Sequence, residues 1–392
     1  MATMTKLRAY RGPALFSYGF RPFFLFGAIQ AGVMIPLWLA VFAGEISLPI
    51  AFAPRDWHVH EMLFGYVVAV IAGFLLTAVP NWTGRLPFQG VPLAVLFSTW
   101  LVGRFAVNFS GVIGWGAALT LDGLFLLLLA AAAAREIVAG RKWGNLKVVG
   151  IVSLLAVANL AFHIEAHFNG LAEYSTRAGI ALVVTLVGVI GGRIVPSFTR
   201  NWLARQLPGR MPSPFGRFDA VAMVVGVVAL VVWVAEPTGR VAAVLLGLAG
   251  ALHLIRLSRW AGERTFPDRL VLILHVAYAF LPAGYFLIAL SALDLVAPSA
   301  GVHAWTGGAI GTMTIAVMTR ATLGHTGRTL AASPATQMLY FAVVTAALAR
   351  VCASLEPSHA DVLLPAAGVA WTLAFVGFAS IYGPLLSRAR KP

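Results

Sequence analysis

Apolar segments of about 20 residues recur along the whole chain, and they restrict its fold more than any other feature of the sequence. The runs are bounded by Pro, Gly, Asn and charged residues. They predict helices at roughly 21–43, 59–80, 91–109, 113–134, 148–168, 177–197, 219–235, 240–257, 269–291, 302–319, 335–353 and 362–385.

Twelve such helices would use nearly all of the 392 residues. With 60% apolar and 11% charged residues, the chain has too little polar surface for a water-soluble globule of this size. The sequence therefore predicts an all-α, polytopic membrane protein with about twelve transmembrane helices. We expect one transmembrane domain over 1–392.

Basic residues cluster in alternate connections between the apolar runs. The net charge of +14 is explained better by a membrane than by a nucleic-acid partner, because Lys and Arg do not line one face of the chain. The opposite connections hold little more than Arg55, Arg177 and Arg240. The connections rich in basic residues contain Arg85; Arg135, Arg141, Lys142 and Lys147; Arg200, Arg205, Arg210 and Arg217; Arg256, Arg259, Arg264 and Arg269; Arg320 and Arg328; and Arg388, Arg390 and Lys391.

This asymmetry predicts that both termini lie in the cytoplasm. Lys6, Arg8 and Arg11 precede the first apolar run, as in a signal peptide, but no small-residue cleavage pattern follows a short apolar core. We interpret the run as an uncleaved first helix.

Short matches recur at an interval of 120 residues: Asn81-Trp82 with Asn201-Trp202, and Thr199-Arg200 with Thr319-Arg320. Each pair falls at the predicted cytoplasmic end of the second, sixth or tenth helix. The spacing favours three pseudo-repeats of four helices, at roughly 15–135, 136–257 and 258–392.

Five of the nine histidines have predicted positions near the non-cytoplasmic face. His58 and His60 are expected to open the second helix, His163 and His167 to end the fifth, and His303 to open the tenth. Polar side chains are costly in hydrocarbon unless they find partners, so they often mark binding sites.

The spacing of His163 and His167 places two imidazoles on one helical face, which suits two ligands of one metal, although histidines at a helix end can also simply cap it. Asn159 continues the same stripe one turn deeper. His60 is expected to point inward more clearly than His58, and imidazole is a ligand for both haem iron and copper. His303 corresponds roughly to His60 in the third pseudo-repeat. We take His60, His163, His167 and His303 as candidate metal ligands, and His58 as a further cofactor ligand.

Arg104 and Asp122 lie at similar depths in the third and fourth helices, which form an antiparallel hairpin. The pairing of opposite charges would reduce their cost in the bilayer. Alternatively, Arg104 could hold a haem propionate through charge-assisted hydrogen bonds. Arg193, one turn before Pro196, permits the same two interpretations.

Several cofactor classes are not supported by any motif. The single cysteine, Cys352, excludes an internal disulfide, a redox CxxC pair and a thiolate metal cage. A Walker A loop, a GxGxxG turn and a CxxCH haem-attachment site are also missing from the sequence.

Several longer motifs resemble those of the NnrS family, from one end of the chain to the other. They are Tyr18-Gly-Phe-Arg-Pro-Phe-Phe24; Trp57-His-Val-His-Glu-Met-Leu-Phe-Gly65; Gly73-Phe-Leu-Leu-Thr-Ala-Val-Pro-Asn-Trp-Thr-Gly84; Gly191-Gly-Arg-Ile-Val-Pro-Ser-Phe-Thr-Arg-Asn201; and Met318-Thr-Arg-Ala-Thr-Leu-Gly-His-Thr-Gly-Arg328. The His-x-His-Glu-Met segment is the most specific of them.

The resemblance implies a bacterial inner-membrane protein that contains haem b and also copper and takes part in the response to nitric oxide. We expect a redox enzyme, similar to a nitric oxide reductase, that binds nitric oxide and reduces or removes it. Glu61 and Glu165 are candidate proton carriers. Electrons would come from a quinol or a separate cytochrome. A transporter of haem, copper or a nitrosyl-metal species and a non-catalytic scavenger are the alternatives.

Overall fold

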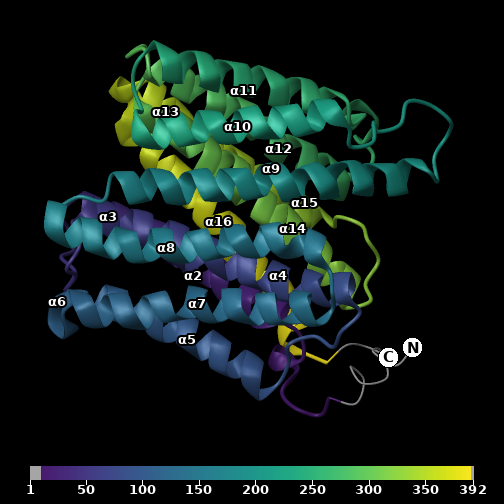
Figure 1. The fold of residues 1–392 in the computed structure, drawn as a ribbon, viewed down its shortest axis with the longest axis horizontal. Helices are drawn as coiled ribbons and strands as arrows, with labels where there is room; N and C mark the ends of the chain where they lie inside the picture. Colours follow the sequence, from purple (N-terminus) through teal and green to yellow (C-terminus); the bar gives the residue numbers. More distant parts are fainter. Residues whose placement is uncertain (1–9, 390–392) are drawn as a thin grey trace. The chain divides into compact units, whose positions relative to one another are not determined.

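The computed structural model describes residues 10–389, and all regular structure in this range is helical (Figure 1). Eleven of the helices are long and apolar enough to cross a membrane, which confirms a multi-pass membrane protein. The α-helices are α2 (Phe20–Phe42), α3 (Pro54–His60), α4 (Val68–Thr83), α5 (Val91–Asn108), α6 (Ser110–Ile113), α7 (Trp115–Ala139), α8 (Leu146–Asn169), α9 (Tyr174–Leu203), α10 (Arg217–Ala235), α11 (Arg240–Ser258), α12 (Arg269–Ser291), α13 (Pro298–His303), α14 (Thr312–His325), α15 (Pro334–Leu355) and α16 (Ala360–Ser387).

Two π-helices interrupt the second and the tenth predicted helix. They are η2 (Glu61–Val67), between α3 and α4, and η5 (Ala304–Gly311), between α13 and α14. The segment Pro54–Thr83 is one of the eleven candidate spans, whereas the segment 298–325, the predicted tenth span, is helical but is not among them. π-Helices are rare and are often found at functional sites.

The expectation that His60 and His303 open their helices is wrong. Both helices begin several residues earlier, with Pro54 and Pro298 in the first turn. Proline is tolerated there because the first N–H groups of a helix have no partner within the helix. His60 and His303 are instead the last residues of α3 and α13, directly before the two π-helices.

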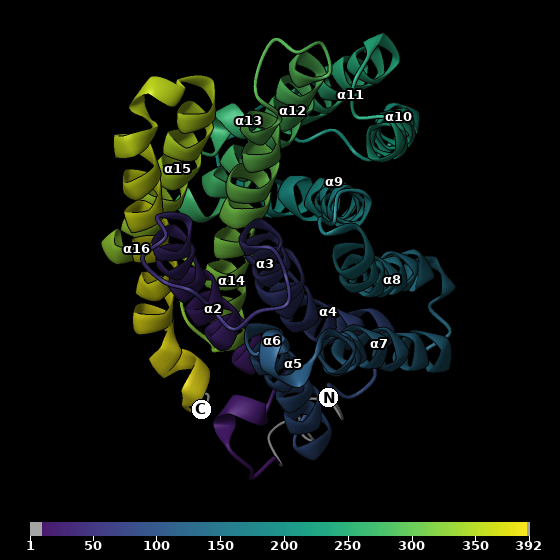
Figure 2. The ribbon, with the colours of Figure 1, turned by 90° about the vertical axis from the view of Figure 1, so that its left-hand side faces the viewer.

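The described residues divide into two compact units: residues 10–179, 322–328 and 375–389, and residues 180–321 and 329–374. In the first unit α7 packs against α4, α5 and α8, and α2 packs against α4 (Figure 2). The ring of Phe23 contacts those of Trp100 and Phe125, so aromatic side chains from α2, α5 and α7 form part of the core. The three predicted pseudo-repeats stay a prediction.

In the second unit α11 packs between α10 and α12, and α13 and η5 pack against α12 and α15. A buried ion pair joins α10 to α11: Arg256 Nε lies 3.1 Å from Asp219 Oδ1. The Trp305 indole of η5 donates a hydrogen bond to the Leu281 carbonyl of α12. Polar contacts therefore fix the register of neighbouring helices inside an otherwise apolar unit.

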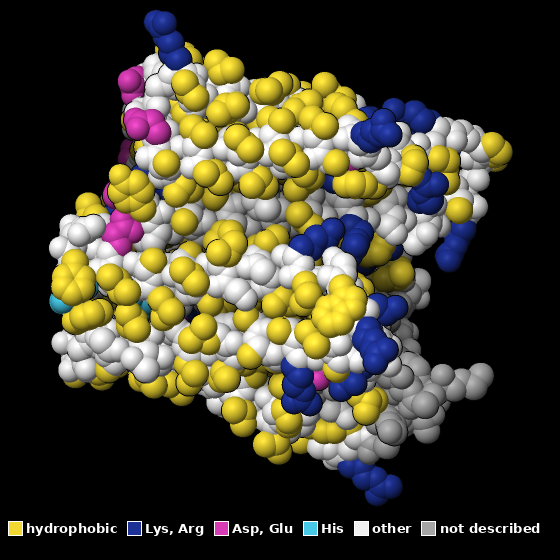
Figure 3. Space-filling model, in the orientation of Figure 1, with side chains coloured by type: hydrophobic (Ala, Val, Ile, Leu, Met, Phe, Trp, Pro, Cys, Tyr) yellow, Lys and Arg dark blue, Asp and Glu magenta, His cyan; other side chains and the backbone are white. Residues whose placement is uncertain are grey.

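Basic side chains gather at particular helix ends. In the second unit they lie where α10 begins and α11 ends, and Figure 3 shows this cluster over those ends, with acidic side chains at the opposite ends. In the first unit Arg135, Arg141 and Lys147 lie at the connection between α7 and α8. The side of the membrane on which these ends lie stays a prediction, and Lys6, Arg8, Arg390 and Lys391 are outside the described residues.

We expect cysteine-accessibility mapping to place the connections around Arg141, Arg205 and Arg264 in the cytoplasm, because basic residues next to spans are retained there. Single cysteines would be introduced into a Cys352→Ser background, since Cys352 is exposed. An impermeant thiol reagent should label them only after the cells are opened. Labelling of the 141 and 205 connections from opposite sides would contradict the topology.

Candidate metal centre

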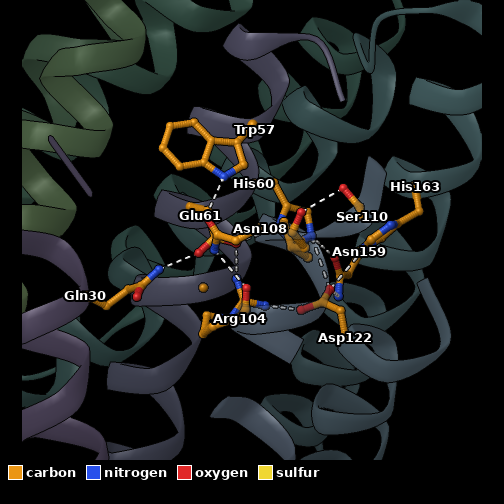
Figure 4. A network of polar contacts seen from close by, with 12 residues as sticks. Gln30, Trp57, His60, Glu61, Arg104, Asn108, Ser110, Asp122, Asn159 and His163 are labelled. Carbon is orange, nitrogen blue, oxygen red and sulfur yellow. Dashed lines mark hydrogen bonds and ion pairs between the residues drawn. The ribbon is translucent and has the colours of Figure 1, made fainter. Parts of the chain in front are cut away.

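Three buried side chains of the first unit converge on one point: His60 at the end of α3, Asp122 in α7 and His163 in α8 (Figure 4). Their nitrogen and carboxylate oxygen atoms all lie within 4.8 Å of one another. The Nε2 atoms of His60 and His163 are each 3.2 Å from the same atom, Asp122 Oδ2. The three exposed fractions are 0%, 3% and 1%, respectively, so the centre is shielded from bulk solvent.

Asn159 links the three side chains from one turn before His163 in α8. Its Nδ2 donates to Asp122 Oδ2 at 2.7 Å, and its Oδ1 accepts from His60 Nε2 at 2.9 Å. Both imidazoles thus direct Nε2 toward the carboxylate. Neither Nδ1 atom has a hydrogen-bond partner within residues 10–389, although His60 Nδ1 lies 3.6 Å from Glu61 Oε1.

Arg104 in α5 joins the two carboxylates of the centre. Its Nη2 donates to Asp122 Oδ1 and its Nη1 donates to Glu61 Oε1 at 2.6 Å, so the ion pair predicted for Arg104 and Asp122 is confirmed. The other Glu61 oxygen accepts a hydrogen bond from Gln30 in α2. Asp122 therefore presents one oxygen to Arg104 and the other to the imidazoles.

The charges of this buried cluster do not balance when both imidazoles are neutral. Glu61 and Asp122 contribute two negative charges and Arg104 contributes one positive charge, with exposed fractions of 0%, 3% and 5%. A net charge without a partner is costly in a low-dielectric interior. The centre therefore becomes neutral with one further positive charge, supplied by a proton on an imidazole or a carboxylate, or by a metal ion.

Two glycines leave room for this network between closely packed helices. A Cβ atom at Gly65 of η2 would lie 2.6 Å from Arg104 Nη1, and one at Gly103 of α5 would lie 3.1 Å from the Cα of Asp122. The carbonyl of Gly65 also accepts a hydrogen bond from the Trp100 indole at 3.0 Å. The π-helix and its glycine thus let the Arg104 guanidinium pass directly against the backbone.

We expect Gly65→Ala to destabilise the protein by about 1–3 kcal/mol, because the added methyl group displaces the Arg104 guanidinium from two buried carboxylates. Thermal unfolding of the detergent-solubilised protein measures the effect. Gly150→Ala is the matched control, since a Cβ there meets no atom within 4 Å and alanine favours a helix. Equal unfolding temperatures for the two variants would show that Gly65 has no such role.

Aromatic rings enclose the two imidazoles. The ring centroid of His60 lies 5.4 Å from those of Phe52, Phe64 and Phe162, and 4.9 Å from that of His163. Because both Nε2 atoms converge on one oxygen, a porphyrin plane does not fit between them, whereas a single ion does.

The groove of about 390 Å³ formed by α5 and α7 is lined by apolar and hydroxyl side chains and includes none of these residues.

The other residues predicted for the site lie elsewhere. His58 is partly exposed and its ring stacks on Trp38, and His167 is exposed and stacks on Trp115 at 4.0 Å. Glu165 accepts three backbone N–H bonds from residues 173–175, at the beginning of α9. His303, whose Nδ1 donates to the Ser299 carbonyl, and the exposed Arg193 belong to the second unit.

Sequence reasoning placed Asp122 only in an ion pair and Asn159 only on the His163 stripe. The i, i+4 spacing of Asn159 and His163 did indicate that both face one way, and both are buried. The sequence held no signal for the second role of Asp122, because the contact of Arg104 with both Glu61 and Asp122 appears only in the structure.

The helices and this centre define a polytopic membrane protein with a buried group of two histidines and an aspartate, a ligand set that metal ions use. A comparison with protein-family profiles identifies the family. The profile described as NnrS protein matches residues 14–390, so the chain belongs to the NnrS family. Family membership supports a membrane protein of the nitric-oxide response and links it to metal and haem binding. No protein in a search of curated sequences matched the chain.

Proposed function

We propose that this protein is a metal-dependent redox protein that binds nitric oxide at the centre formed by His60, Asp122 and His163, and reduces or removes it. The observation that carries the proposal is the buried cluster of two imidazoles and two carboxylates with only one guanidinium. A bound metal would supply the missing positive charge and an electron-donating binding site for a small diatomic ligand.

The residues of the chain have separate roles in this proposal. His60, His163 and Asp122 Oδ2 hold the ion, and Arg104 fixes the rotamer of Asp122 through Oδ1. Phe52, Phe64 and Phe162 keep bulk water away from the ion. Glu61, held between Arg104 and Gln30, is the nearest additional carboxylate and the better placed of the two predicted proton carriers.

The proposal also includes the wider setting implied by the family. Reduction of nitric oxide consumes electrons and protons, so a quinol or a reduced cytochrome is the proposed donor. A haem b would take its axial ligand from outside the centre, and His58 and His303 are the candidates, since both are partly exposed. We propose the bacterial inner membrane as the location, with both termini in the cytoplasm.

We expect His60→Ala to lower the metal content and to reduce nitric oxide consumption at least tenfold, because the ion loses one of its two imidazole ligands. The measurement is metal analysis, absorption spectra and a nitric oxide electrode trace of the purified protein with a chemical reductant. His359→Ala, an exposed residue of η6 (Pro357–His359), is the control and should change neither quantity.

Unchanged consumption by His60→Ala at equal protein concentration would refute a role of this centre in the reaction. Haem that is present below one equivalent and exchanges with added haem, without consumption of nitric oxide, would favour transport instead.

A further inference from the structure

The ligand set of the buried centre restricts the kind of metal that it can hold. It offers two imidazole nitrogens and one carboxylate oxygen. The only cysteine of the chain, Cys352, is exposed and belongs to the second unit. A carboxylate is a hard ligand, whereas cuprous copper prefers soft sulfur ligands.

We propose that this centre is a site for non-haem ferrous iron, which His60, His163 and Asp122 bind on one face while the opposite positions stay open to a small ligand such as nitric oxide. The inference rests on the proposed function for the presence of a metal and adds its identity and coordination. Two histidines and one carboxylate with open positions are the ligand set of many non-haem ferrous enzymes.

The distances agree with one shared ion. Bonds of about 2.1 Å from an ion to nitrogen and oxygen ligands place neighbouring ligands about 3.0–3.4 Å apart for octahedral to tetrahedral angles. Each imidazole Nε2 lies 3.2 Å from Asp122 Oδ2. Two of the three distances between ligand atoms therefore fit one shared ion, and the third, between the imidazole nitrogens, lies within 4.8 Å.

The surroundings suit coordination through one carboxylate oxygen. Arg104 occupies Asp122 Oδ1, whereas Oδ2 accepts one hydrogen bond, from Asn159 Nδ2, and keeps a lone pair for the ion. When Nε2 of His60 binds a metal, its N–H moves to Nδ1, which lies 3.6 Å from Glu61 Oε1. Carboxylates commonly orient metal-bound histidines in this way. A metal on Nε2 thus gives a role to a buried Nδ1 that has no hydrogen-bond partner among the described residues.

Charge alone does not select the metal, because a monovalent and a divalent cation both remove the net negative charge of the cluster. Ligand number also does not separate ferrous iron from catalytic zinc, which has three protein ligands and an open position, although it does exclude a closed zinc site with four. The redox role of the proposed function selects iron, because zinc has no redox chemistry. The amide oxygen of Asn159, 2.9 Å from His60 Nε2, accepts a hydrogen bond in this arrangement. This hydrogen bond is lost once His60 Nε2 gives up its proton and binds a metal.

The test is anaerobic titration of the full-length, chelator-treated protein in detergent with ferrous iron alone or cuprous copper alone, followed by addition of nitric oxide. We expect one iron per chain and the quartet-spin EPR signal of a non-haem ferrous nitrosyl. Pulsed EPR of protein labelled with ¹⁵N-histidine should detect couplings to two imidazoles, which needs no variant.

The substitution His163→Ala should lower iron affinity at least a hundredfold. The matched control His167→Ala, at an exposed position of the same helix, should leave the iron affinity unchanged.

Binding of cuprous copper in preference to ferrous iron, or coupling to fewer than two histidines, would overturn the iron assignment and leave the proposed metal-dependent function intact. Iron binding with the expected signal but without consumption of nitric oxide would uphold the iron site and refute the proposed function. Retention of iron by His163→Ala would place the ion elsewhere and overturn this inference.

Discussion

Replacing Arg104 by methionine is expected to lower the free energy of unfolding of the metal-free protein by about 3–5 kcal/mol. The guanidinium contacts both Glu61 and Asp122, and its loss leaves two buried carboxylates without a permanent cation. Added metal should restore much of this stability, because a ligand that binds only the folded state stabilises it by mass action. Unfolding in detergent, with and without metal, measures both effects.

The triple variant Glu61→Gln, Arg104→Met, Asp122→Asn is the control for this prediction. It removes all three charges together, so it should be more stable than Arg104→Met although it carries more substitutions. It should also lose the stabilisation by metal, since Asp122 is a proposed ligand. A triple variant that is less stable than Arg104→Met would show that the loss of packing, rather than unpaired charge, causes the effect.

The second large effect is expected in the second unit, where Asp219→Asn should destabilise the protein by about 3 kcal/mol. Arg256 is 1% exposed, and Asp219 is the carboxylate that it contacts. Its Nη1 also donates to the Gly188 carbonyl and to the Tyr278 hydroxyl, and these neutral acceptors cannot replace a carboxylate. Chemical unfolding in detergent measures the change.

An exposed pair in the same unit provides the comparison. Arg210 contacts Glu263 at 2.6 Å, but both side chains are 54% exposed, so Glu263→Gln should cost less than about 1 kcal/mol. Hydrogen bonds from Arg210 lower the pKa of Glu263, so this small stabilisation is present at neutral pH and is lost as the pH falls through that pKa. Similar losses of unfolding free energy for Asp219→Asn and Glu263→Gln would contradict the larger cost that we assign to breaking the buried ion pair.

The apolar runs predicted the helices well because a membrane span leaves few alternatives: a backbone in hydrocarbon must satisfy its hydrogen bonds internally. The predicted span 219–235 agrees with α10, and the predicted span 269–291 has the bounds of α12. The segments that begin at Pro54 and Pro298 were placed too late. Hydropathy does not detect the polar first turns of these helices, which contain Arg55 and Ser299.

The histidines show where local pattern stops being informative. His163 and His167 have the spacing of one helical face, yet one is buried beside Asp122 and the other is exposed and stacks on Trp115. Residues at positions i and i+4 differ by about 40° around the helix axis, so their side chains point in similar but not identical directions. The neighbouring helices decide which of the two directions is buried.

The sequence by itself determined that the chain is an all-helical membrane protein of the NnrS family, because composition, run length and motifs are local properties. Only the tertiary structure decided which polar residues share a site. His60, Asp122 and His163 come from α3, α7 and α8, and the close approach of these helices depends on side-chain packing across residues that are distant in sequence. The cost of leaving a buried charge unpaired then selects the partners, and that cost exists only once the helices have assembled.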